Sequence, residues 1–153
     1  MERADEKAME EIVHIIPLGH EIDRAVRPFD KLKANRVHLL AVTETFGKYS
    51  EEMIEKQKYY LNIVKEKLEE KGIRVQSVNV DMSNVLQVME KVGEIIREER
   101  QRNNLVYVNI SASGGFNSVG PTLAAMYEGA KAYGVSADGY SEDEEEMRKH
   151  GIS

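Results

Sequence analysis

The sequence of 153 residues contains no cysteine, and this absence excludes a disulfide framework, a thiolate zinc site and a cysteine nucleophile. It also has no apolar run that approaches the length of a membrane-spanning helix, and no apolar core of a secretory signal near its N-terminus. We therefore expect a soluble cytoplasmic protein without membrane contact. The length suits one domain with a single core.

An excess of positive charge is also missing. The 21 Lys and Arg residues stand against 27 Asp and Glu, which gives a formal net charge of -6. This balance argues against sequence-independent binding of duplex DNA, which depends on clustered basic side chains. Residues 1–11 and 141–153 each carry a net charge of -3, so the stretch between them is neutral. We predict an acidic extension over residues 1–10, one domain over 11–140 and an acidic tail over 141–153.

Hydrophobic residues make up 41% of the chain, and they fall into two alternating patterns. Short β-branched runs predict strands, and three of these runs are nearly continuously apolar, as is typical of parallel strands covered on both faces. Stretches with apolar residues three and four positions apart predict the helices between them. The expected strands span residues 11–16, 36–42, 74–80, 105–110 and 134–139, and the expected helices span 22–32, 50–72, 83–96 and 121–133.

Local signals mark where these helices begin and end. Pro28 is expected to kink or restart the first helix, Ser50 is the expected N-cap of the second, and Gly72 is expected to end it. The fourth helix is rich in small residues, which would let it lie close against the sheet or against a symmetry mate. These small residues are Ala124, Ala125, Gly129, Ala130 and Ala132.

The alternation of strands and helices predicts an α/β fold, an open, doubly wound, mainly parallel Rossmann-like sheet with helices on both faces. Ligands of such folds bind beyond the carboxyl ends of the strands. The fold prediction therefore directs the search for a site to the loops that follow the strands.

Two of these loops differ from ordinary connections, residues 17–24 after the first strand and 109–121 after the fourth. The second has no charged residue but contains serine, asparagine and three glycines, with Pro121 at the expected first turn of a helix. Glycine backbone amides and a helix N-terminus favour a phosphate. A polar turn without a ligand is the alternative.

Familiar nucleotide and metal motifs do not account for these loops. No G-x-G-x-x-G follows the first strand, and Pro121 stands where a P-loop with the spacing of Gly115 and Gly120 needs lysine. We therefore reject an NTPase. No cluster of His or Cys accompanies Glu21 and Asp23, so we expect neither a metal site nor a cofactor.

Together, Pro17-Leu-Gly-His-Glu-Ile-Asp-Arg24, Asn109-Ile-Ser111 and Ser113-Gly-Gly-Phe-Asn117 resemble the corresponding loops of CARF (CRISPR-associated Rossmann fold) domains. The resemblance covers roughly residues 11–150. It is closer to the N-terminal domain of an archaeal family of transcriptional regulators that couples such a domain to a winged helix. The resemblance implies a homodimer that binds a cyclic oligoadenylate, a ring-shaped RNA messenger of antiviral type III CRISPR signalling, across its two-fold axis.

The same resemblance assigns residues to the ligand. The expected contacts are Leu18, Gly19, His20, Asp23, Ser111, Ala112, Ser113, Gly114, Gly115, Phe116 and Asn117. Thr43, with Glu44 and Thr45, is added by its place after the second strand. Many relatives have Lys or Arg where Asn117 stands, and this departure weakens the case for a direct cation and for ring cleavage.

Several of these residues have a second interpretation. His20 could contact phosphate or act as an acid or base, or it could be a hydrogen-bonded loop residue. Arg24 and Arg27 could supply positive charge, or they could pair with local acids. Phe116 is a candidate for base stacking. We assign Tyr59 and Tyr60 to packing, and His14 and His38 to structural roles inside strands.

Three functions follow, in order of preference. The first is a sensor that binds a cyclic oligoadenylate, expected to be the tetramer from ring size and symmetry, and signals to an attached or separate effector. The second is the ligand-binding and dimerisation part of a winged-helix transcriptional regulator. The third is a slow, metal-independent ring nuclease that uses His20, Ser111 and Asn117.

Overall fold

The structure is a computed structural model that describes residues 10–113 and 118–135. Its centre is a parallel sheet of five strands in the order β3-β2-β1-β4-β5. The strands are β1 (Ile12–Pro17), β2 (Arg36–Ala41), β3 (Arg74–Asn79), β4 (Leu105–Asn109) and β5 (Lys131–Tyr133). The helices are α2 (Ile22–Val26), α3 (Glu51–Glu70), α4 (Val85–Gln101) and α5 (Val119–Glu128), with a 3-10 helix over Arg27–Asp30.

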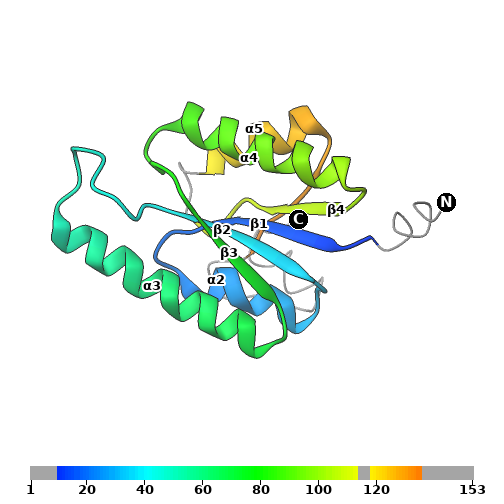
Figure 1. The fold of residues 1–153 in the computed structure, drawn as a ribbon, viewed down its shortest axis with the longest axis horizontal. Helices are drawn as coiled ribbons and strands as arrows, with labels where there is room; N and C mark the ends of the chain where they lie inside the picture. The colour runs from blue at the N-terminus through cyan, green and yellow to red at the C-terminus, as the bar shows by residue number, and fades with distance from the viewer. Residues whose placement is uncertain (1–9, 114–117, 136–153) are drawn as a thin grey trace, which may run out of the picture.

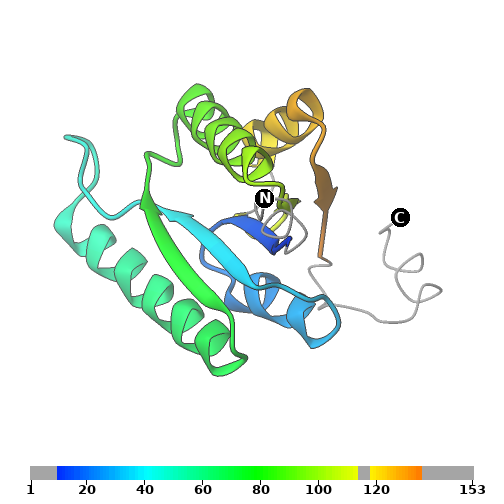
Figure 2. The same cartoon turned by 45° about the vertical axis from the view of Figure 1, so that its right-hand side comes forward.

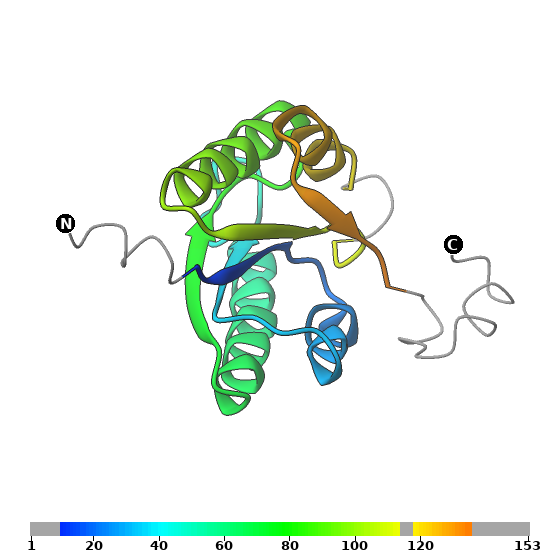
Figure 3. The same cartoon turned by 90° about the vertical axis from the view of Figure 1, so that its right-hand side faces the viewer.

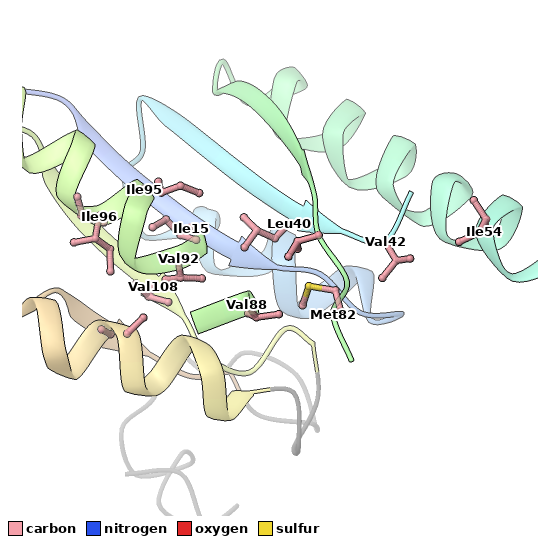
Figure 4. Packing of buried hydrophobic residues seen from close by; sticks show 14 residues of the cluster. Ile15, Leu40, Val42, Ile54, Met82, Val88, Val92, Ile95, Ile96 and Val108 are labelled. Atoms are coloured by element: carbon pink, nitrogen blue, oxygen red, sulfur yellow. The ribbon is translucent and has the colours of Figure 1, made fainter. Parts of the chain in front are cut away.

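The helices form a layer on each face of the sheet, as the sequence predicts. Helices α2 and α3 cover one face, and α4 and α5 cover the other (Figures 1 and 3). Consecutive strand residues point to opposite faces, so Ile15 packs with α4 and α5 while Ile16 packs with α2 and α3. Figure 4 shows Ile15 and Leu40 of the sheet beside Val92 of α4. The doubly wound α/β fold is therefore confirmed.

The predicted helix ends agree with the structure in the first half of the chain. The Ser50 side chain accepts a hydrogen bond from the Met53 amide (3.1 Å) and caps α3. Helix α2 ends at Val26, and the chain continues as a 3-10 turn with Pro28 in its first positions. Gly72, with a φ of 83°, follows the end of α3.

The predicted elements after β4 need correction. The helix expected over residues 121–133 spans Val119–Glu128 and ends at Gly129, which adopts the left-handed conformation (φ 78°). Lys131–Tyr133 then pairs with β4, and Figure 2 shows this orange strand at the edge of the sheet opposite β3. Pairing with β4 outweighs the helical preference of the alanines. The strand expected over 134–139 is therefore misplaced: residues 134 and 135 are not in a strand, and 136–139 lie outside the described residues.

Most small residues of α5 face α4. A Cβ added to Gly120 would lie 2.9 Å from the Val85 carbonyl oxygen, so the two helices approach closely there. Ala124 and Ala125 are buried. The opposite side of α5 exposes Met126 (74%) and Tyr127 (87%).

His14 lies in the middle of the fold and serves packing, as predicted. Its ring stacks on Tyr107 (centroids 5.1 Å apart) and contacts Phe29 edge-on. Nε2 donates to the Lys33 carbonyl (3.1 Å), and Nδ1 accepts from the Tyr133 hydroxyl (2.9 Å). Burial lowers the pKa of His14 to about 4, against the opposing effect of the Lys33 hydrogen bond, so the ring is neutral at pH 7.

Within the described residues, no helix is long and apolar enough to cross a membrane.

Candidate functional site

The two loops singled out in the sequence meet at the carboxyl edge of the sheet. Strands β1 and β4 are neighbours, but the chain leaves β1 toward α2 and β4 toward α5 on the other face. Such a reversal leaves a crevice between the two loops. A Cβ added to Gly19 would lie 2.9 Å from Cα of Ser113, so only glycine fits this approach.

Asn109 shapes the loop after β4. Its side chain is fully buried, and Oδ1 accepts hydrogen bonds from the amides of Ser111 and Ala112 (both 3.0 Å). Nδ2 donates to the Arg24 carbonyl (3.0 Å). One side chain therefore fixes the loop after β4 and ties it to α2.

Arg24 reinforces the same junction. Its Nη1 donates to the Ser111 carbonyl (3.0 Å), and its Nε lies 2.9 Å from Oε1 of Glu21, an ion pair without the alignment of a hydrogen bond. The side chain is 16% exposed. Of the two roles that the sequence left open, the structure gives Arg24 the pairing with a local acid.

A cavity of about 380 Å³ opens beside this junction. Besides the loops after β1 and β4, its walls come from the ends of β2 and β3 and from the first turns of α3. The residues that line it are Leu18, Gly19, His20, Glu21, Val42, Tyr49, Met53, Gln57, Met82, Ser83, Ala112 and Ser113.

Asp81, which follows β3, fixes the part of the cavity wall that lies between β2 and α3. Its buried carboxylate accepts hydrogen bonds from the Tyr49 hydroxyl (2.6 Å) and the Ser83 hydroxyl (2.8 Å), and it forms an ion pair with Lys48 (2.7 Å). Burial opposes ionisation, but the hydrogen bonds from Lys48, Tyr49 and Ser83 outweigh it and lower the pKa of Asp81. Lys48 also donates to Ser83 (3.2 Å) and so places an ammonium group next to a cavity residue.

Helix α3 supplies the remaining wall through Met53 and Gln57, which share one helix face with Tyr60 at positions i, i+4 and i+7. Met53 and Gln57 line the cavity, and Gln57 is only 5% exposed. Tyr60 stacks on His20 (centroids 5.2 Å apart, rings 25° from parallel). Tyr60, assigned to packing, therefore packs on a predicted ligand residue, whereas Tyr59 is 63% exposed.

The predicted site residues divide into three groups. Those that line the cavity are Leu18, Gly19, His20, Ala112 and Ser113. Asp23, Arg24, Thr43 and Ser111 do not line it. The Thr43 amide donates to Asn79, and Ser111 Oγ accepts from the Val135 amide (2.7 Å). The predicted contacts Gly114, Gly115, Phe116 and Asn117 lie outside the described residues.

Half of the residues in the cavity wall were not predicted from the sequence. Val42, Tyr49, Met53, Gln57, Met82 and Ser83 line the cavity without having been predicted. Two signals could have identified four of them: the strand-end rule applied to the third strand points to Met82 and Ser83, and the stripe of Met53, Gln57 and Tyr60 on the long helix points to Met53 and Gln57. The stripe is informative because Gln57 places an amide on a face that is otherwise apolar and aromatic.

The cavity has the features of a binding site for a ligand with both apolar and polar parts. Its apolar side chains include Val42, Met53 and Met82, and its hydrogen-bonding groups include His20 and Ser113. Among the described residues, no group of three or more His, Asp or Glu side chains could hold a metal ion.

The family model described as HFX_2341_N:-like, N-terminal, matches residues 12–140. The uncharacterized protein MJ1513 of Methanocaldococcus jannaschii is 26% identical over 148 residues, which cover 90% of this chain and 42% of that protein. The chain thus spans less than half the length of this relative.

Two solved structures share the fold. Can2 from Sulfobacillus thermosulfidooxidans, in complex with cyclic tetra-adenylate, has a TM-score of 0.66 at 12% identity, and the match covers 83% of this chain and 32% of Can2. A type III CRISPR defence DNA nuclease activated by cyclic oligoadenylate has a TM-score of 0.55 at 16% identity, and the match covers 84% of this chain and 19% of the nuclease.

Proposed function

The chain belongs to the family described as HFX_2341_N:-like, N-terminal, and we propose that it is a CARF-type sensor domain that binds a cyclic oligoadenylate in type III CRISPR signalling. The observation that carries this proposal is the cavity between the loops after β1 and β4, at the switch point of the sheet. Can2, which was solved in complex with cyclic tetra-adenylate, and the type III CRISPR defence nuclease activated by cyclic oligoadenylate share this fold and support the choice of ligand.

The size of the cavity supports a two-fold dimer. Its volume of about 380 Å³ lies near the lower end of the roughly 300–1,000 Å³ that suits a drug-sized ligand. A ring of four nucleotides is much larger than such a ligand, so one copy would enclose only part of it. We propose that a second copy completes the site and that the ring is cyclic tetra-adenylate, whose symmetry matches a two-fold axis.

The exposed face of α5 is our candidate for the contact between the two copies. Leu123 (46% exposed), Met126 and Tyr127 form this face, and α5 follows directly after the loop from β4. A contact through this face would bury apolar side chains that are otherwise in water. It would also bring the β4 loops of two copies toward one another, as a shared ligand requires.

Within each copy, we propose that His20, Ser113 and the neighbouring backbone amides contact phosphates and riboses, with Lys48 as a cation at the rim. Asn117 remains a proposed contact from the sequence. The signal would pass to an attached or separate effector such as a winged-helix domain, because the relatives extend well beyond the matched region.

Isothermal titration calorimetry with cyclic tetra-adenylate and cyclic hexa-adenylate tests the proposal. We expect the tetramer to bind with one ring for every two copies, and His20→Ala and Asn117→Ala to weaken binding about tenfold each, which is the size of a lost hydrogen bond to a charged group. Lys58→Ala is the control, because Lys58 is exposed on α3 and does not line the cavity. No heat with either ring at micromolar protein would refute the sensor. Chromatography of the ring after incubation in EDTA would detect cleavage.

A further inference from the structure

Gln57 lies in the wall of the cavity with most of its side chain covered. It is 95% buried and lines the cavity, yet its side chain forms no hydrogen bond with the rest of the described chain. Among the described residues, the fully buried side-chain atoms without a hydrogen-bond partner are Arg24 Nε and His38 Nδ1, so the Gln57 amide is not sealed in the core but open to the cavity. In the other residues of the stripe the side chains are apolar or aromatic, so helix packing alone does not explain a glutamine here.

The surroundings of Gln57 fit a flat aromatic ring. Met53 lies one helical turn before Gln57 and lines the cavity with it, and Met82 and Tyr49 line it from the segments after β3 and β2. Thioethers and aromatic rings pack well against the face of a heteroaromatic base. The Tyr49 hydroxyl is engaged with Asp81, which fixes the position of its ring. An apolar wall with one amide is the usual composition of a pocket that orients its ligand through a few polar groups.

We infer that Gln57 recognises the edge of an adenine base of the bound ring, an inference that rests on the proposed function. A glutamine side chain has one carbonyl acceptor and two N–H donors. Oε1 would accept from the exocyclic amine of adenine, and Nε2 would donate to the adjacent ring nitrogen N7. Hypoxanthine and guanine carry an acceptor oxygen in place of the amine, so along this edge they leave Oε1 without a donor. Gln57 thus selects adenine, while the polar loops hold the backbone of the ring.

The test compares Gln57→Met with the wild type for two rings, cyclic tetra-adenylate and its inosine counterpart. Methionine has nearly the same shape but lacks the amide, so it removes recognition without opening a cavity. We expect Gln57→Met to weaken binding of the adenylate ring about tenfold, the size of a lost bidentate base contact. Binding of the inosine ring should change much less. Thermal stability should stay close to that of the wild type, because the Gln57 side chain forms no hydrogen bond with the described part of the chain.

Gln101→Met is the matched control, since Gln101 is an exposed residue at the end of α4, and it should change neither binding nor stability. If Gln57→Met binds the adenylate ring as tightly as the wild type, or weakens both rings equally, the inference is overturned and the sensor proposal stands. If the wild type binds neither ring, the proposed function itself fails, and the inference fails with it.

Discussion

The two edges of the sheet bury polar side chains in different ways. At the amino edge, polar groups pair with one another, with the exception of His38 Nδ1, which is buried without a hydrogen-bond partner among the described residues. Arg36 donates to both oxygens of Glu99 (2.6 and 2.8 Å), and the same carboxylate accepts from His38 (2.8 Å) and Asn104 (2.9 Å). Burial opposes ionisation of Glu99, but the hydrogen bonds from Arg36, His38 and Asn104 outweigh it and lower its pKa to about 2.

At the carboxyl edge, buried polar side chains either form hydrogen bonds that fix the loops or face the cavity. Asn109 and Asp81 accept hydrogen bonds from backbone amides and hydroxyls of the connecting segments, whereas the Gln57 side chain forms no hydrogen bond within residues 10–113 and 118–135. The comparison separates three uses of a buried polar group: closing a network that stabilises the fold, shaping a loop, and recognising a ligand. Substitutions at the two edges should therefore have different consequences.

The largest effect is expected from Arg36→Met, which leaves the buried Glu99 carboxylate without its cation. We expect the free energy of unfolding in urea to fall by about 3 kcal/mol, the lower end for breaking a buried ion pair, because His38 and Asn104 remain. Affinity for the ring should be unchanged in protein that is still folded. Arg74→Met is the control, because Arg74 is 61% exposed and its pair with Glu11 should contribute less than about 1 kcal/mol. Equal losses in the two variants would contradict a special role for the amino edge.

Gly19→Ala should act mainly on binding. The added methyl group would collide with the backbone of Ser113, so the loops after β1 and β4 must move apart. We expect affinity for cyclic tetra-adenylate to fall at least about tenfold, with a loss of stability of about 1–3 kcal/mol from overpacking. Gly134→Ala is the control at the same edge, because its Cβ would meet nothing closer than 3.9 Å. Wild-type affinity in Gly19→Ala would show that the junction of these loops does not form the site.

A change of pH should have a smaller effect on the free energy of unfolding, and it acts through His14, which lies between the two edges of the sheet. Its folded pKa of about 4 lies below the ordinary 6.5, so between these values the unfolded chain binds more protons and stability falls as the pH falls. From pH 7 to pH 5 the loss should be about 2 kcal/mol, measured by urea unfolding. His14→Gln should remove most of this dependence. A variant with the same pH dependence as the wild type would refute a neutral, buried His14.

Sequence reasoning succeeded where the signal is local. The β-branched runs of β1 and β2, the N-cap Ser50 and the turn at Pro28 depend on neighbouring residues, and the structure agrees with them. It failed for β5, because three residues after Gly129 join the sheet only through pairing with β4. No local pattern contains that long-range pairing.

The residues of the candidate site also fall into those that local sequence identifies and those that only the fold reveals. Glycine and polar residues after β1 and β4 identify their loops from sequence alone. The roles of Gln57 and Asp81 depend on which segments the fold brings together, and neither belongs to a recognisable motif. Arg24 combines both cases: the sequence allowed a phosphate contact or a pair with a local acid, and the structure shows the pair with Glu21 together with a hydrogen bond to Ser111 that no local pattern indicates.

Methionine methyl groups give the most direct test of a ligand site at the carboxyl edge. Met53 and Met82 line the cavity, whereas Met89 belongs to α4, packs against the core and does not line the cavity. In a titration of methyl-labelled protein with cyclic tetra-adenylate, followed by NMR, we predict that the Met53 and Met82 signals shift in proportion to bound ring, while Met89 shifts much less. Binding that leaves Met53 and Met82 unmoved would place the ligand elsewhere and contradict the account.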